Sequence, residues 1–235
     1  MIYAQIMAGG FGKRMGNTSL PKQFLLLGHK PIIVHTIEKF ILNNKFELIL
    51  VSVPPSWIDY TNEILEKYQV KDDRIRVISG GAERNDTLEN AIKYIEETNG
   101  LNDDDAIVAH DAVRPFVTKR IIDDNIKALK TYQAVDTVIP AFDTIVRANG
   151  TELIEIPIRD EMYQGQTPQS FNIKTFQKSY AKLSDSQKLI LSDSAKIVLL
   201  SGEKVAMVCG EQSNIKVTTP YDLKIAAALI ENGKE

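Results

Sequence analysis

The chain has 235 residues, 43% of them hydrophobic, a length that suits one α/β domain with a substantial core, so we expect a single domain over residues 1–235. Its 28 basic and 31 acidic side chains give a net charge of −3, which provides no positive field for nucleic acid or anionic membranes and argues against both partners. A lone cysteine, Cys209, no charged leader and no run of roughly 18 apolar residues together predict a cytoplasmic protein.

Apolar runs of strand length alternate with amphipathic stretches over the first half of the chain. We expect strands at residues 3–8, 47–53, 75–79 and 106–110, and helices at 31–41, 57–68, 87–97 and 119–130. This alternation predicts a Rossmann-like α/β fold, with a mostly parallel twisted sheet and helices on both faces. Ligands bind such sheets at the carboxyl ends of the strands, so the loops AGGFGKRM, SGGAERND and HDAVRP become candidate site loops.

The pattern changes at about residues 137–160, where extended segments reverse at Asn149-Gly150, two residues that tolerate positive φ. We expect a protruding β-hairpin arm whose apolar side chains pair with a second copy, giving a homodimer. The alternative is a hairpin folded back on its own domain. The stretch YQGQTPQSF then predicts a loop, followed by helices at about 173–182 and 220–232.

The first glycine loop can be compared with two common phosphate loops. A nucleoside-triphosphate P-loop needs Ser or Thr where this chain has Arg14, and a dinucleotide fingerprint needs glycine or alanine where it has Met15. What remains is a glycine turn whose N–H groups approach phosphates, with Arg14 and Lys22 adding charge-assisted contacts. This favours a reacting triphosphate over a redox dinucleotide.

Further motifs follow in a fixed order. They are Ala8-Gly9-Gly10, Gly12, Arg14-Met15, Pro21-Lys22-Gln23-Phe24, Gly80-Gly81 with Arg84, HDAVRP at 110–115, Asp143-Thr144, Gln166-Thr167-Pro168-Gln169 and NIKVTTP at 214–220. In this order they resemble the family of sugar-phosphate and polyol-phosphate cytidylyltransferases that includes methylerythritol-phosphate cytidylyltransferase. The resemblance spans residues 4–223, so chance is a poor explanation, although each motif alone is weak.

The resemblance implies a nucleotidyltransferase fold and transfer of a cytidylyl group from CTP to a polyol phosphate, with Mg²⁺. It implies that Arg14, Lys22 and Lys216 are catalytic. It places CTP on Ala8, Gly9, Gly10, Gly12, Gly81, Ala82, Thr87 and Asp111, with Asp111 also holding the metal. For the acceptor it implies Ser192 of one subunit and, from the arm of the other, Thr144 and Arg159.

Each of these residues also has a plainer interpretation. The cations can be solvated surface side chains, Asp111 a helix cap or a partner for Arg114, Arg159 a surface arginine and Ser192 a helix cap. His110 is expected to be structural, because a single histidine at a strand end is more often hydrogen-bonded than catalytic. The whole chain could also be a non-catalytic nucleotide-binding module, an alternative that the presence of all four charged residues, Arg14, Lys22, Asp111 and Lys216, disfavours.

Finer features bear on the acceptor. Some family members act on ribitol 5-phosphate and supply CDP-ribitol for teichoic-acid-type wall polymers. This chain resembles them at Tyr163-Gln164-Gly165, Val113, Arg84-Asn85-Asp86-Thr87, and Lys196-Ile197 after Ser192-Asp193. Ser192 and Ser194 depart from the Thr and Ala usual in that family. Ribitol 5-phosphate is therefore the expected acceptor, and methylerythritol 4-phosphate, used in isoprenoid synthesis, is the alternative.

Overall fold

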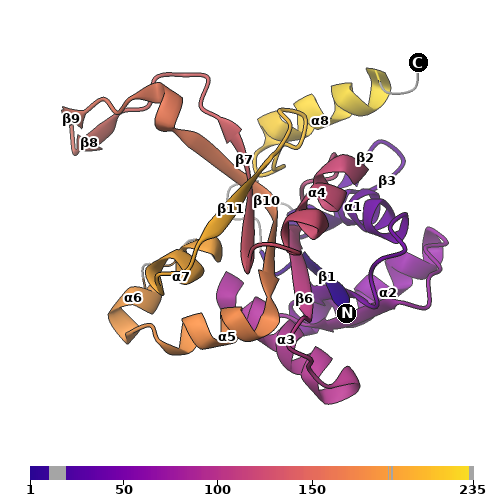
Figure 1. Cartoon of the computed structure of the whole chain (residues 1–235). Helices are drawn as coiled ribbons and strands as arrows, with labels where there is room; N and C mark the ends of the chain where they lie inside the picture. The colour runs from indigo at the N-terminus through magenta and orange to yellow at the C-terminus, as the bar shows by residue number, and fades with distance from the viewer. Residues whose placement is uncertain (11–19, 190, 192, 233–235) are drawn as a thin grey trace.

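The computed structural model of the chain describes residues 1–10, 20–189, 191 and 193–232. Within this part, a seven-stranded sheet forms the centre of the molecule, in the order β11-β7-β10-β6-β1-β4-β5 (Figure 1). Its strands are β1 (Ile2–Met7), β4 (Ile49–Val53), β5 (Ile75–Ser79), β6 (Ala106–Asp111), β7 (Ala134–Pro140), β10 (Tyr163–Asn172) and β11 (Val205–Cys209). Among these described strands, β10 alone runs antiparallel to its neighbours, so the predicted mostly parallel α/β sheet is confirmed.

Strand β10 occupies the stretch for which we predicted a loop, and that prediction is wrong. Glycine and proline in YQGQTPQSF are typical of loops, yet the segment pairs with β6 on one side and β7 on the other. Its ladder with β7 is irregular between Gly165 and Gln169, and Pro168 lies in this irregular stretch. A proline is tolerated there because the missing N–H interrupts no regular ladder bond.

Helices cover both faces of the sheet, as predicted, and each face has its own core. One face carries α1 (Ile32–Ile41), α2 (Ile58–Lys67) and α4 (Lys119–Ala128), and the other α3 (Arg84–Asn99), α5 (Ile173–Ala181) and α7 (Ala195–Leu200). Side chains alternate along β1, so Ala4 and Ile6 enter the first core whereas Tyr3 and Met7 enter the second. Both faces of β1 are covered, which explains why its sequence is apolar apart from the buried Gln5.

A third, smaller core brings the end of the chain to the middle of the sheet. Helix α8 (Pro220–Asn232) packs on the hairpin of β2 (Leu26–Leu27) and β3 (Lys30–Pro31), which follows the short 3-10 helix η2 (Lys22–Phe24). Just before α8, the backbone N–H of Val217 donates to the carbonyl of Val113 over 2.8 Å. The segment containing Lys216 is thereby held beside the loop that follows β6.

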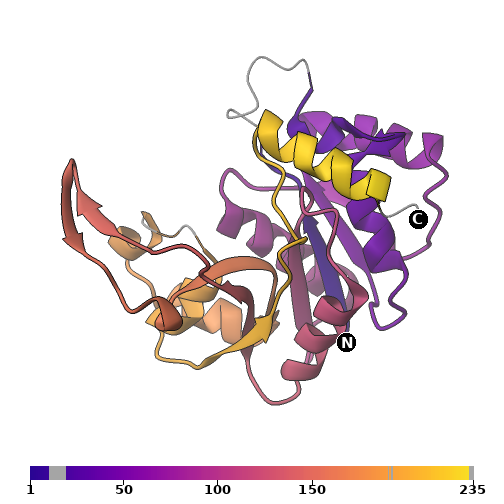
Figure 2. The same cartoon turned by 90° about the horizontal axis from the view of Figure 1, so that it is seen from above.

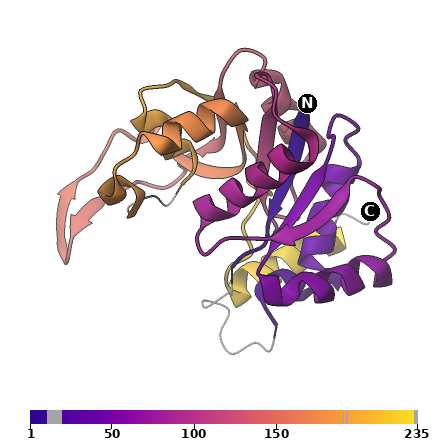
Figure 3. The same cartoon turned by 90° about the horizontal axis from the view of Figure 1, so that it is seen from below.

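The predicted arm is present. Strands β8 (Arg147–Asn149) and β9 (Glu152–Glu155) form a separate two-stranded antiparallel sheet that projects away from the body (Figures 1, 2 and 3). It is shorter than expected, because residues up to Pro140 belong to β7 in the central sheet. The reversal also lies one residue later than predicted: Asn149 pairs with Glu152, and Gly150, with φ of 58°, begins the turn.

Three short helices complete the described elements. Helix η4 (Arg159–Glu161) closes the arm before β10, and α6 (Asp185–Leu189) lies between α5 and α7, while η3 (Pro55–Trp57) precedes α2. In the described residues, no helix combines the length and the apolar character that crossing a membrane requires.

Candidate functional site

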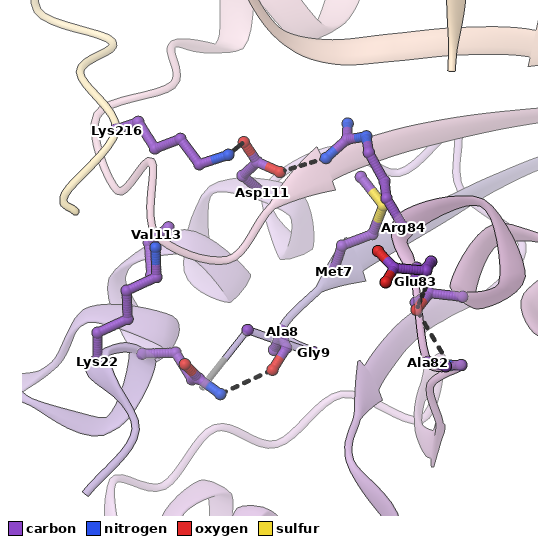
Figure 4. A pocket seen from close by; sticks show the side chains of 14 residues that line it. Met7, Ala8, Gly9, Lys22, Ala82, Glu83, Arg84, Asp111, Val113 and Lys216 are labelled. Carbon is purple, nitrogen blue, oxygen red and sulfur yellow. Dashed lines mark hydrogen bonds and ion pairs between the residues drawn. The ribbon is translucent and has the colours of Figure 1, made fainter. Parts of the chain in front are cut away.

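A cavity of about 270 Å³ opens where β1, β5 and β6 end, which is the edge that the sequence predicted for ligands. Figure 4 shows the residues that line it, which come from stretches far apart in the sequence, among them Lys22, Arg84, Asp111 and Lys216. Among its lining are the predicted residues Ala8, Gly9, Gly10, Lys22, Gly81, Ala82, Thr87, Asp111 and Lys216. The two glycine loops and the loop after β6 therefore form one pocket.

The first glycine loop is anchored on both sides of Ala8. The Ala8 N–H donates to the carbonyl of Ser52 over 2.8 Å, and the Ala8 carbonyl accepts a 2.7 Å hydrogen bond from the buried amide of Gln23. Among the described residues, a Cβ placed on Gly10 would meet Lys22 Cε alone, at 3.9 Å. A bound group can therefore come close to this backbone, which is the arrangement that phosphates use.

The second glycine loop is packed much more tightly. A Cβ on Gly81 would lie 2.3 Å from Asp86 Cβ, so no other residue fits without moving the loop. Thr87 Oγ1 accepts from the Gly81 N–H over 3.0 Å and donates to the Glu83 carbonyl over 2.8 Å. These bonds set the loop onto the start of α3, whose N-terminus carries partial positive charge and opens toward the pocket.

Asp111 ends β6 and is the centre of the charged groups. Its carboxylate is 5% exposed and lies 2.6 Å from Arg84 Nη1, 2.9 Å from Lys216 Nζ and 3.5 Å from Arg114 Nε. Burial alone would raise the pKa of Asp111, but these three cations together hold it well below its usual value. Asp111 is therefore ionised at any physiological pH.

The charges around the cavity favour an anionic ligand. Lys22, Arg84 and Lys216 all line it, and Asp111 neutralises only part of their charge. Positive side chains, open glycine N–H groups and a helix N-terminus together match a polyphosphate. The same groups can stabilise negative charge that builds on phosphate oxygens during a transfer reaction.

His110 is kept away from this chemistry. It is fully buried, with Nδ1 2.9 Å from Thr167 Oγ1 and Nε2 3.1 Å from the carbonyl of Arg114. Burial lowers its pKa to about 4, so the ring is neutral at physiological pH. These contacts agree with the structural role expected for this histidine.

The remaining predicted residues are not part of this pocket as described. Gly12, Arg14 and Ser192 lie outside the described residues. Thr144 and Arg159 belong to the arm segment, and neither is among the described residues that line the cavity of their own chain. Arg159 has a half-exposed side chain whose nearest acid is its neighbour Asp160, at 4.0 Å.

Sequence reasoning gave no role to two residues that the structure places at the site. Arg84 was noted only as part of a motif, yet it contacts Asp111 and lines the pocket. Gln169 was noted only within QTPQ, yet its buried amide accepts from Arg84 Nη2 over 3.2 Å. The position of Arg84 directly after a glycine loop was a usable signal, whereas Gln169 gave none, because it sat in a segment predicted to be a loop.

The donor atoms near the cavity limit how a metal could bind. Among the described residues, no group of three or more His, Cys, Asp or Glu side chains is placed to hold an ion. Asp111 supplies one ionised carboxylate, and Mg²⁺ commonly binds through one or two carboxylates together with waters and substrate phosphates. The site therefore fits Mg²⁺ as a partner of a bound polyphosphate, and does not fit a metal held by protein ligands alone.

Comparisons with known proteins agree with this arrangement. Residues 2–232 match the family model described as IspD: 2-C-methyl-D-erythritol 4-phosphate cytidylyltransferase. The structure of 4-diphosphocytidyl-2C-methyl-D-erythritol synthase from Anaerococcus prevotii is 27% identical, with a TM-score of 0.80, over 98% of this chain and 96% of that one. The structure of 2-C-methyl-D-erythritol 4-phosphate cytidylyltransferase (IspD) from Francisella tularensis is 28% identical, with a TM-score of 0.78, over 96% of this chain and 97% of that one. The 2-C-methyl-D-erythritol 4-phosphate cytidylyltransferase from Thermus thermophilus, 24% identical with a TM-score of 0.74 over 98% and 100% of the chains, shares the fold.

Proposed function

This chain belongs to the IspD family of cytidylyltransferases, and we propose that it transfers the cytidylyl group of CTP to the phosphate of a sugar alcohol, releasing pyrophosphate. It has the IspD-like nucleotidyltransferase fold, and family membership makes it a nucleotidyltransferase enzyme. The observation that carries the proposal is the pocket itself, which is lined by residues of two glycine loops, by the cations Lys22, Arg84 and Lys216, and by the buried carboxylate of Asp111.

The reaction needs no side chain to activate the nucleophile. A phosphate monoester has a second pKa near ~6 and is already largely dianionic at neutral pH, so its oxygen attacks the α-phosphorus directly. Catalysis then consists of alignment and of stabilising charge on the α-phosphate and the leaving pyrophosphate. We assign the second task to Arg14, Lys22 and Lys216, of which Lys22 and Lys216 line the described pocket.

The nucleotide is bound mainly by backbone groups. Ala8, Gly9, Gly10, Gly12, Gly81 and Ala82 are proposed to present N–H and carbonyl groups to phosphates and cytosine, with Thr87 fixing the second loop. Asp111 would hold Mg²⁺ at this site, and the bound metal would supply Lewis-acid stabilisation of the charge on the phosphates. Asp111 is ionised already, so it requires no proton loss before it can bind a cation.

Ribitol 5-phosphate is the acceptor we propose. What supports this acceptor is the sequence: Tyr163-Gln164-Gly165, Val113, Arg84-Asn85-Asp86-Thr87 and Lys196-Ile197 resemble the family members that act on ribitol 5-phosphate. The product is then CDP-ribitol, a precursor of teichoic-acid-type wall polymers.

2-C-methyl-D-erythritol 4-phosphate is the second candidate, and the comparisons favour it. The family model and the related structures carry the name of that substrate. The chain is 27% and 28% identical to those two structures, so the choice between the two acceptors rests on a direct test.

A panel of acceptors separates these candidates. Pyrophosphate release would be measured with CTP, Mg²⁺ and either ribitol 5-phosphate, 2-C-methyl-D-erythritol 4-phosphate or ribulose 5-phosphate. We expect kcat/KM for ribitol 5-phosphate to exceed that for 2-C-methyl-D-erythritol 4-phosphate by at least about tenfold, because the linear and methyl-branched polyols differ by contacts worth ~1–3 kcal/mol. The reverse order would assign the protein to the methylerythritol reaction, and no release with any acceptor would indicate a non-catalytic nucleotide-binding module.

The arm supports a homodimer in which each active site is shared. Large apolar side chains on it are half-exposed or more within their own chain: Phe142, Val146, Leu153, Ile154, Ile156 and Ile158. A two-stranded ribbon of this kind is marginally stable alone, and pairing two arms around a two-fold axis would bury this surface. The same pairing would carry Thr144 and Arg159 to the acceptor phosphate in the partner's site, with Ser192 contributed from the first subunit.

A further inference from the structure

Gln169 connects two parts of the molecule through one fully buried side chain. Its Nε2 donates to Asp136 Oδ1 over 3.0 Å and to Asp193 Oδ2 over 2.7 Å. Its Oε1 accepts from Arg84 Nη2 over 3.2 Å. Because both N–H groups are used by carboxylates, the amide can present only its oxygen to Arg84.

This orientation places a neutral group between a cation and two acids. Arg84 is attracted by Asp111 at the pocket and by the charge of Asp136, and a guanidinium binds whichever carboxylate it can reach. Gln169 presents only its carbonyl oxygen to Arg84, so among the described residues the carboxylate that pairs with Arg84 is Asp111, at 2.6 Å. The Arg84 side chain is thus directed toward the pocket that it lines.

The second link runs to the segment before α7. Asp193 Oδ1 accepts from the Ala195 N–H over 2.8 Å, while its other oxygen is held by Gln169. The next residue, Ser194, donates to Asn85, which directly follows Arg84 in α3. The segment is therefore fixed at two points, to Gln169 through Asp193 and to α3 through Asn85.

We propose that Gln169 is a positioning residue for cytidylyl transfer. It directs Arg84 toward the nucleotide and fixes the segment 193–195 against the nucleotide-binding loop, so that donor and acceptor sides are aligned. The inference rests on the proposed function and adds to it a residue that acts through Arg84 and Asp193.

Gln169→Glu tests this role with little change in side-chain volume. The variant removes both donated hydrogen bonds and adds a third carboxylate beside Asp136 and Asp193, opposite Arg84 and near Arg114. We expect kcat to fall about 30-fold at about pH 8 relative to wild type. The variant-to-wild-type ratio should then rise about fivefold by about pH 6, because a protonated carboxyl in the cluster again donates a hydrogen bond. Using the ratio cancels the titration of the acceptor phosphate.

Asn125→Asp is the matched control. Asn125 is also fully buried, on the other face of β10. Its amide N–H donates to Thr137 Oγ1 over 2.9 Å, and its amide oxygen accepts from Ser170 Oγ over 2.8 Å. It should lose stability without the pH-dependent loss of kcat. The proposal would be overturned if kcat of Gln169→Glu stayed within about threefold of the wild-type kcat at every pH, or if the control showed the same kinetic profile.

A second readout does not need turnover. CTP affinity is measured by calorimetry for Gln169→Ala with Arg84 intact and in an Arg84→Ala background. We expect a loss of about fivefold in the first case and less than about twofold in the second, because Gln169 acts through Arg84. Equal losses in both would overturn the positioning role. Absence of turnover by the wild type, with this cycle behaving as expected, would refute the proposed function and leave the positioning role supported.

Discussion

The nucleotide pocket and the arm differ in how far their interactions are completed within one chain. In the pocket, the buried carboxylate of Asp111 has three cationic partners, and both glycine loops are anchored by hydrogen bonds to the same chain. On the arm, Ile156 and Ile158 are 59% and 66% exposed, and Arg159 lies beside a single exposed acid. The difference agrees with our proposal that one subunit binds the nucleotide, whereas use of the acceptor needs the arm of a second copy.

The largest effect should come from breaking the pocket side. Lys22→Ala or Lys216→Ala is expected to lower kcat by about 100-fold or more, because a cation lost beside the reacting phosphates removes roughly 3 kcal/mol of transition-state stabilisation. Steady-state pyrophosphate release measures this, and circular dichroism checks the fold. Lys127→Ala, an exposed lysine on α4, should behave as wild type. Turnover near the wild-type rate in either folded variant would remove that lysine from the mechanism.

A smaller and more selective effect should come from the arm. Arg159→Ala is expected to reduce kcat/KM for the acceptor by about 30-fold while changing the KM for CTP by less than about twofold, since a charged hydrogen bond to phosphate contributes ~1.5–3 kcal/mol. Initial rates measured at varied acceptor and at varied CTP concentrations give kcat/KM for the acceptor and the KM for CTP separately. Arg147→Ala, which removes an arm arginine paired with Glu155 over 2.8 Å, is the matched control. An equal loss for both substrates would show that Arg159 is not specific to the acceptor.

Assembly can be tested separately from chemistry. Ile156→Asp places a charge on the exposed apolar side of the arm and should weaken dimerisation by about tenfold or more, because a buried unpaired carboxylate is unfavourable. Sedimentation velocity over a concentration series measures this, with Glu152→Gln as an arm control. The CTP affinity of the monomer should stay near that of wild type. A dimer unaffected by Ile156→Asp would mean that the arm does not form the interface.

The smallest effect concerns stability near the base of the arm. Burial first, and then the nearby charge of Asp193, raise the pKa of Asp136 from 3.8 to about 6. Between these two values the folded chain binds a proton that the unfolded chain has lost, so the free energy of unfolding falls as pH rises through this window. Asp136→Asn should therefore become more stable relative to wild type, by on the order of 2 kcal/mol, between about pH 4 and about pH 7. Urea unfolding at each pH measures this, and a difference of opposite sign would contradict the cause given for the shift.

Much of the nucleotide side could be predicted because local rules suffice there. Strands that are buried on both faces give unbroken apolar runs, and parallel strands end at the same edge, so the loops after β1, β5 and β6 could be expected to meet. The approach of Lys216 to Asp111 could not be derived in this way. It depends on the packing of α8, 100 residues and several elements later, and only the family resemblance suggested it.

The errors lie where tertiary pairing overrides local preference. The glycine and proline of YQGQTPQSF predicted a loop, but pairing on both edges with a local irregularity made it β10. The hairpin turn was placed one residue early because Asn149 tolerates positive φ, whereas its pairing with Glu152 keeps it in the strand. Gln169 was overlooked for a related reason, since its partners Arg84, Asp136 and Asp193 are far apart in sequence and meet only in the folded sheet.

Mixing two inactive variants tests most directly whether the pocket of one subunit works with the arm of the other. Arg159→Ala keeps an intact pocket and Lys22→Ala keeps an intact arm, so their heterodimer contains one site with both groups. After subunit exchange at equal concentrations, half of the dimers are mixed, and we expect recovery to about a quarter of the wild-type activity. Activity no greater than that of the separate variants, despite subunit exchange verified by native mass spectrometry, would contradict the shared site and assign the arm to its own chain.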